Sequence, residues 1–145
     1  MKETSFEISG MEELTEELQR AVKIYPDCAE KMLEEQAIEF KKKVAERYKR
    51  IIKRRRTGKL TRGFRISKVK GFRTNMEIDF MAESKANPHF HLVENGHEMV
   101  TRSGNSLGRI DGYHVVEKTR SDYGRVMLLA TAAMIDDILR ESGLN

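Results

Sequence analysis

Residues 27–52 read DCAEKMLEEQAIEFKKKVAERYKRII, and this stretch decides the fold. Its apolar side chains recur at steps of four, three, four, four and three residues, the spacing of one helical face. The pattern also repeats every 11 residues, close to the natural helical period, so the helix should be almost straight. It predicts a helix over residues 28–56. The apolar positions are Leu33, Ala37, Phe40, Val44, Tyr48 and Ile51.

The predicted helix is long for the size of the chain. At 1.5 Å per residue it would measure roughly 43 Å. A compact domain of this length has a diameter of roughly 38 Å. We therefore expect part of the apolar stripe to lie against a neighbouring subunit.

A second amphipathic pattern precedes this stretch. Ser9 and Glu12 have the spacing of a capping box, which marks a helix start. Pro26 is expected to end this first helix, and Asp27 to begin the next, so that residues 11–56 form a helical arm. The apolar face of the first helix consists of Met11, Leu14, Leu18, Val22 and Tyr25.

The middle of the chain has strand patterns. GFRISKV (residues 63–69) and NMEIDFM (residues 75–81) alternate apolar and polar side chains, which predicts an antiparallel hairpin. Residues 97–102 and 107–111 flank a turn and predict a second hairpin. The β-rich part thus covers residues 57–112.

The helical period returns at the end of the chain. It predicts a helix over residues 113–143, with Gly143 as its C-terminal cap and Gly124 as a candidate break. The order of elements predicts a single α+β domain over residues 1–145, with the C-terminal helix packed on a small antiparallel sheet.

The charges are unevenly distributed. Residues 1–40 carry a net charge of −7, residues 41–75 of +15 and residues 76–145 of −4. One interpretation of the basic run is a solvated helix end whose cations complement the helix dipole. The other is a contact with DNA phosphate or an acidic protein. The run comprises Lys49, Arg50, Lys53, Arg54, Arg55, Arg56 and Lys59.

Several classes of protein are disfavoured. The single cysteine, Cys28, excludes an internal disulfide and a multi-cysteine zinc site. The first ten residues lack the apolar core of a signal peptide, and the longest nearly apolar run, Val126–Ile135, is too short to cross a membrane. We expect an intracellular protein without a membrane contact.

All four histidines fall between His89 and His114, which raises the question of a metal or catalytic site. However, Asn87-Pro88 is typical of a helix start and Gly96 of a stop, which predicts a short helix near residues 88–95. His89 and His91 would then point in different directions. We therefore expect no metal, cofactor or catalytic residue, and keep a histidine-dependent metal nuclease as an alternative.

Three boxes carry a resemblance to a known family. They are TGxL at Thr57, Gly58 and Leu60; HLVExGH at His91, Leu92, Val93, Glu94, Gly96 and His97; and GxHxxEK at Gly112, His114, Glu117 and Lys118. In this order they resemble the phage tail-completion and head–tail joining proteins grouped with the minor tail component of lambdoid phages. The resemblance covers most of the chain.

The resemblance implies a structural component of the virion neck, and not an enzyme. Such proteins assemble as rings, often hexameric, between the connector below the capsid and the tail tube. The expected partners are copies of itself, the connector or adaptor, and tail tube or terminator proteins, with packaged DNA as a further contact. The expected location is the host cytoplasm during assembly and then the virion.

We also interpret two of the boxes physically. Gly96 and Gly112 would be backbone pivots, while Glu94, His97 and His114 would hold the loop between them by hydrogen bonds. Glu117 completes this candidate structural box. The alternative function is a DNA-binding module that uses residues 41–70.

Overall fold

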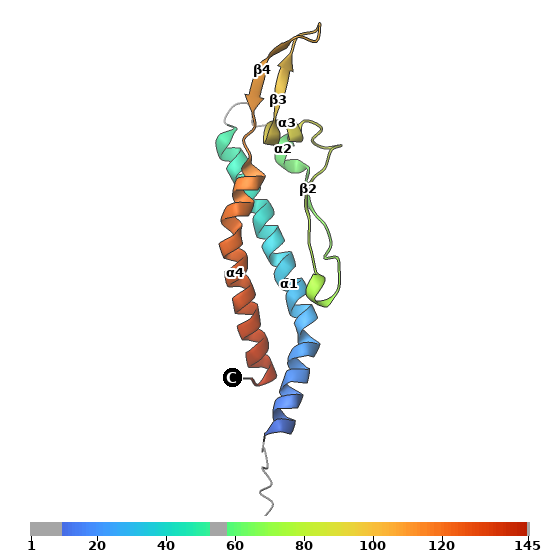
Figure 1. The fold of residues 1–145 in the computed structure, drawn as a ribbon, viewed down its shortest axis with the longest axis vertical. Coiled ribbons are helices and arrows are strands. Elements are labelled where there is room, and N and C mark those ends of the chain that lie inside the picture. The colour runs from blue at the N-terminus through green and yellow to red at the C-terminus, as the bar shows by residue number, and fades with distance from the viewer. Residues whose placement is uncertain (1–9, 53–57, 145) are drawn as a thin grey trace, which may run out of the picture.

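The computed structural model describes residues 10–52 and 58–144, and two long antiparallel helices form its scaffold (Figure 1). These are α1 (Met11–Ile51) and α4 (Val115–Ser142). The chain between them lies along α1 and around its C-terminal end. The fold is α+β, as the sequence predicted. The other elements are α2 (Lys59–Arg62), β1 (Phe64–Ile66), the 3-10 helix η1 (Arg73–Asn75), β2 (Phe80–Ala82), α3 (Phe90–Asn95), β3 (Gly96–Val100) and β4 (Ser106–Asp111).

Helix α1 continues through Pro26 as one helix of 41 residues, so the prediction of two helices that meet there is wrong. Proline inside a helix removes one backbone hydrogen bond and costs about 3 kcal/mol. Packing on both sides of Pro26 offsets this cost, because Tyr25 and Ala29 both lie in a cluster with Ile138 of α4. Helix α1 ends at Ile51 and Ile52 is not helical, so the predicted continuation of the helix is wrong at Ile52. The expected Ser9 cap and residues 53–56 lie outside the described residues.

Two clusters hold α1 against α4. The first joins Ala29 to Met134 and Ile138 near the C-terminal half of α4. The second surrounds Tyr48 at the other end of α4, where aromatic rings meet edge to face, a geometry that favours ring pairs beyond their buried area. Its buried and partly buried members include Phe40, Val44, Tyr48, Phe64, Phe80, Phe90 and Val115.

Each predicted hairpin is present. Strands β1 and β2 pair with Phe64 opposite Ala82. This pairing brings the rings of Phe64 and Phe80 together in the core, with their centroids 5.1 Å apart. Strands β3 and β4 pair with His97 opposite Ile110. This second hairpin projects from the end of the molecule, and every residue of β4 is exposed (Figure 1).

Helix α4 is also uninterrupted, so the candidate break at Gly124 is not observed. Gly143 ends the helix in the left-handed conformation at φ 89°, as predicted, and its amide donates to the carbonyl of Arg140 at 3.3 Å. None of the described helices is long and apolar enough to cross a membrane.

Candidate functional site

The buried carboxylate of Glu94 caps the N-terminus of α4. Glu94 is only 7% exposed. One carboxylate oxygen accepts hydrogen bonds from the amide of Val115 at 3.0 Å and from the Tyr48 hydroxyl, and the other accepts from the amides of Val116 at 2.8 Å and Glu117 at 3.4 Å. The first amides of a helix have no partner within it, and the helix dipole favours an anion there. We call this arrangement the Glu94 junction.

Two glycines allow the backbones to cross at the Glu94 junction. Gly96 has φ 76°, and a Cβ atom there would lie 2.4 Å from the carbonyl oxygen of Ile110. A Cβ atom on Gly112 would lie 2.2 Å from the carbonyl oxygen of Glu94. Both distances are far below a van der Waals contact, so only glycine fits at either position without a shift of the backbone.

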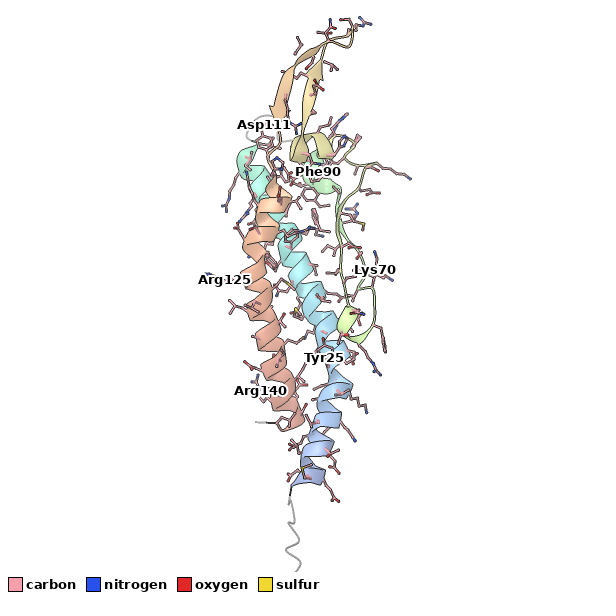
Figure 2. The ribbon with its side chains drawn as sticks, viewed as in Figure 1. Tyr25, Lys70, Phe90, Asp111, Arg125 and Arg140 are labelled. Atoms are coloured by element: carbon pink, nitrogen blue, oxygen red, sulfur yellow. The ribbon has the colours of Figure 1, made fainter. Side chains whose placement is uncertain are left out.

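Backbone hydrogen bonds complete the Glu94 junction. The carbonyl of Val93 accepts from the amide of Tyr113, and the carbonyl of Glu94 accepts from the amide of His114, both at 3.0 Å. The C-terminal end of α3 is therefore bonded directly to the segment that leads into α4. Phe90 and Asp111 lie at this same end of the molecule (Figure 2).

Tyr48 links the Glu94 junction to α1. Its ring is almost fully buried between Phe64 and Phe90, at centroid distances of 6.0 and 5.8 Å. Burial, together with the hydrogen bond to the Glu94 carboxylate and its negative charge, raises the pKa of Tyr48 well above its usual value. The hydroxyl therefore stays protonated and remains a donor over the physiological range.

The four histidines lie in different surroundings. His89 and His91 are exposed, and Nδ1 of His97 is buried without a hydrogen-bond partner. His114 precedes α4 in the left-handed conformation at φ 50°, with Nδ1 3.3 Å from a carboxylate oxygen of Glu117. Among residues 10–52 and 58–144, no group of three or more His, Cys, Asp or Glu side chains is placed to hold a metal ion.

The short helix α3 begins two residues later than predicted. The backbone at Pro88 and His89 forms a turn, and α3 starts at Phe90 and stops before Gly96. Asn87 is not its cap. The buried Asn87 side chain instead donates to the carbonyl of Leu60 and so ties the segment before α3 to α2.

The basic residues extend around the C-terminal end of α1. Lys49 and Arg50 lie exposed in its last turn, where cations complement the helix dipole, and Lys59 opens α2. Lys53, Arg54, Arg55 and Arg56 lie outside the described residues. This end of α1 is also the end at which the Glu94 junction and the β3–β4 hairpin lie (Figure 1).

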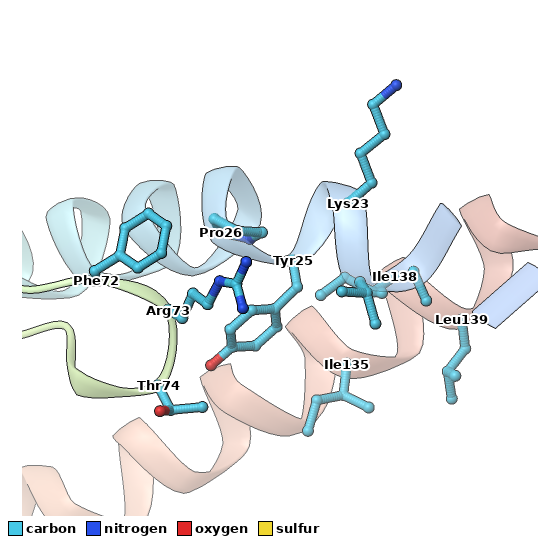
Figure 3. A pocket seen from close by; sticks show the side chains of 11 residues that line it. Lys23, Tyr25, Pro26, Phe72, Arg73, Thr74, Ile135, Ile138 and Leu139 are labelled. Carbon is cyan, nitrogen blue, oxygen red and sulfur yellow. The ribbon is translucent and has the colours of Figure 1, made fainter. Parts of the chain in front are cut away.

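An apolar groove of about 590 Å³ lies at the opposite end, between α1, η1 and α4 (Figure 3). The ring of Tyr25 occupies its centre, with Ile135 and Leu139 on the α4 side and Lys23 pointing away. This groove was not predicted from the sequence, because it forms from three segments that are far apart in the chain. We call it the Tyr25 groove.

The sequence was compared with known proteins. Residues 12–96, more than half of the chain, match the family HK97-gp10_like, described as "Bacteriophage HK97-gp10, putative tail-component". The chain belongs to this family. No curated protein and no solved structure matches it.

Membership of the HK97-gp10-like family makes the chain a phage tail-related structural protein. The matched residues run from the start of α1 to Gly96, so they include Tyr48 and Glu94 from the Glu94 junction. They also include the α1 and η1 sides of the Tyr25 groove. Helix α4 and strand β4, which complete these features, follow the matched region.

Glu94 was predicted as a member of the structural box, but its capping role and its hydrogen bond with Tyr48 were not predicted from the sequence. Tyr48 was expected only as an apolar stripe residue, although a tyrosine in a buried stripe needs a partner for its hydroxyl. Glu94 lies in α3 but caps α4, which begins 21 residues later in the chain, so local sequence patterns did not predict this role. The expected hydrogen bonds of His97 are not observed at Nδ1.

Proposed function

We propose that this HK97-gp10-like protein is a structural subunit of the head–tail junction, where it completes the tail by assembling with copies of itself into a ring. The observation that carries the proposal is the amount of apolar surface at both ends of an elongated molecule. Soluble monomers rarely expose contiguous apolar patches of this kind unless a partner covers them. The exposed side chains are Met11, Leu14, Leu18 and Val22 on α1, and Met99, Val100, Leu107 and Ile110 on the β3–β4 hairpin.

The exposed hairpin supports assembly independently. Two-stranded hairpins are marginally stable in water without a packed face. Met99 and Ile110 are exposed on one face of β3–β4, and Val100 and Leu107 lie exposed near its turn. A neighbouring subunit, or a connector or tail protein, would provide the missing packing.

The Glu94 junction has a structural role in this proposal. It joins α1, α3 and α4 through one carboxylate and so fixes where the hairpin leaves the body. It includes Glu94, Gly96, Gly112, Glu117 and the backbone amide of His114 from the candidate structural box, while His97 lies beside it. We assign it no catalytic step, and we infer that the protein acts through contacts made first in the host cytoplasm and then in the virion.

Deletion of the encoding gene from the phage or prophage tests the proposal. We expect filled heads and separate tails by electron microscopy, and recovery of joined particles when the wild-type chain is supplied from a plasmid. Native mass spectrometry of the purified protein should give a closed set of copies of the 16.8 kDa chain, with a hexamer expected. Joined, infectious particles in the deletion strain would contradict the proposal.

A DNA contact is the second candidate, supported by the +15 charge of residues 41–75. If this segment contacts DNA phosphates, the purified chain binds duplex DNA with an affinity that falls steeply with salt. Replacement of Lys49 and Arg50 by alanine should lower the slope of that dependence by about two. Unchanged binding in this double variant would assign the basic segment to a protein partner or to solvent.

A further inference from the structure

The N-terminal end of α1 carries an apolar stripe that its own chain leaves exposed. We call residues 11–20 the arm. Met11, Leu14 and Leu18 follow one another at steps of three and four residues and are 52%, 42% and 50% exposed, and the stripe continues to Val22, which lines the Tyr25 groove of its own chain. The arm extends past the C-terminal end of α4 (Figure 1), which lies near Glu17. An amphipathic helix end of this kind gains most of its stability from packing of its apolar face.

The Tyr25 groove is an exposed apolar surface that could receive the apolar stripe of the arm. Tyr25, Phe72 and Ile135 line it, and Phe72 is 71% exposed. Leu139 continues its wall along α4. Leu128 lies on the same face of α4 seven residues before Ile135 and is also exposed, so the apolar surface extends beyond the groove itself.

The arm and the loop beside the groove have opposite charges. The arm carries four glutamates and one arginine, for a net charge of −3. The loop that contains η1, residues 67–76, carries Lys68, Lys70 and Arg73 and no acidic side chain, for a net charge of +3. Lys70 pairs with Asp79 of the same chain, whereas Arg73 lies over the Phe72 ring at the rim of the groove.

These charges select one arrangement of two copies. Two arms packed against each other would bring like charges together, which destabilises a contact. An arm packed in the groove of another copy brings opposite charges together and covers both apolar surfaces. The glutamates of the arm are Glu12, Glu13, Glu16 and Glu17.

We propose that the arm of one copy docks in the Tyr25 groove of the next copy, as an amphipathic helix docks in a hydrophobic groove. The contact joins two different surfaces, so every docked copy still offers a free arm or a free groove. Repetition of such a head-to-tail contact gives a ring when its rotation closes. The inference rests on the ring assembly proposed above and names the surfaces that make it.

Disulfide trapping between two variants tests the contact. Both start from Cys28→Ala, which removes the natural cysteine; one then carries Leu18→Cys on the arm and the other Phe72→Cys at the groove. We expect the mixture to form a Leu18–Phe72 crosslink on mild oxidation, and each variant alone to form little dimer. A Ser103→Cys variant, at the tip of the distant β3–β4 hairpin, is the control partner.

The outcomes separate clearly. A dominant dimer of the Leu18→Cys variant with itself would mean arm-to-arm packing and would overturn the proposal. So would equal crosslinking to the Ser103→Cys control, or no crosslink in any mixture.

A matched pair of charge substitutions gives a second measurement. Leu18→Lys places a cation in the apolar stripe, whereas Gln19→Lys adds the same charge on an exposed neighbouring position. Because burying a leucine side chain accounts for a factor of ten or more in affinity, we expect Leu18→Lys to weaken self-association by about tenfold or more. Gln19→Lys should weaken it by about twofold or less. Equal effects of the two would overturn the docking.

This inference and the proposed function can fail separately. If closed rings form but no crosslink joins Leu18 to Phe72, the ring function stands and the docking site is wrong. If the crosslink forms but deletion of the gene leaves heads and tails joined, the docking stands and the head–tail function is wrong.

Discussion

The hydroxyl of Tyr48 donates a hydrogen bond to the carboxylate of Glu94, which also accepts from three amides of α4. A single side chain from the short helix α3 thus fixes the start of the C-terminal helix against the end of the N-terminal one. The stability of the fold should depend strongly on this carboxylate.

Replacement of Glu94 by glutamine tests that dependence. Glutamine has nearly the same shape, but its amide nitrogen would face a donor, since all four partners of Glu94 are donors. We expect Glu94→Gln to lower the free energy of unfolding by about 1–3 kcal/mol, measured by urea denaturation. Glu98→Gln on the exposed β3 strand is the control and should change it by less than about 0.5 kcal/mol. Similar losses in both variants would contradict a specific role for Glu94.

The raised pKa of Tyr48 predicts a pH dependence. An unfolded tyrosine has a pKa of about 10, and the folded pKa of Tyr48 lies above this value. The stabilisation from its hydroxyl should therefore be fully present below about pH 10 and be lost as the pH rises toward the folded pKa. Tyr48→Phe should be less stable than the wild type by about 1–2 kcal/mol at neutral pH, and this difference should shrink in alkali.

Ultraviolet titration provides the measurement for Tyr48. In the folded protein, Tyr48→Phe should leave the tyrosinate absorbance near pH 11 unchanged, because Tyr48 does not ionise there. In concentrated urea, the same substitution should remove one tyrosine from the titration. A smaller folded-state amplitude in Tyr48→Phe would show that the hydroxyl is not held by Glu94.

Two glycines should respond in opposite directions to alanine. Gly112→Ala would place a Cβ atom 2.2 Å from the carbonyl oxygen of Glu94 and should destabilise the protein by more than about 1 kcal/mol. Gly124 lies inside α4 with open space around it, so Gly124→Ala should stabilise the protein by about 0.5–1 kcal/mol. Thermal unfolding compares the two. A stabilised Gly112→Ala variant would refute the close crossing at the Glu94 junction.

The histidines near the Glu94 junction provide a test against metal chemistry. We expect His97→Ala and His114→Ala to impair folding or ring assembly, through a cavity beside β3 and loss of the contact with Glu117 respectively. Elemental analysis of purified wild type and variants should show the same metal content. Stoichiometric zinc that disappears in either variant would favour the nuclease alternative.

Local patterns determined most of the fold. The 11-residue repeat predicted the second half of α1, alternation predicted both hairpins, and Gly143 predicted the end of α4. The prediction that the helix ends at Pro26 was wrong because it considered only the helix-breaking tendency of proline. It left out the packing of Tyr25 and Ala29 against α4, which stabilises the continuous helix. The spacing of Val22, Tyr25 and Ala29 continues the apolar face across Pro26, and this continuity was the available signal.

The site was less predictable, because its contacts join residues that are distant in the chain. Gly96 and Gly112 could be predicted as sites of unusual backbone geometry, since glycine is common where φ is positive or where two backbones approach closely. The hydrogen bond between Tyr48 and Glu94 could not be predicted, because nothing in the local sequence relates two positions that are 46 residues apart. The local sequence predicts that the side chain of Asn87 caps the short helix that follows it, whereas in the fold this side chain donates a hydrogen bond to the carbonyl of Leu60.

The antiparallel pairing of the first helix with the last has a consequence for synthesis on the ribosome. Gln36 meets Tyr123 across 87 positions of sequence, which take roughly 4–17 s to translate. Helix α1 is complete once residue 51 has been made, but the part of its apolar face that packs on α4, which includes Ala29, has no α4 partner until the rest of the chain follows. Each nascent chain therefore exposes this apolar surface while α4 is still being synthesised, and exposed apolar surface at this stage favours aggregation.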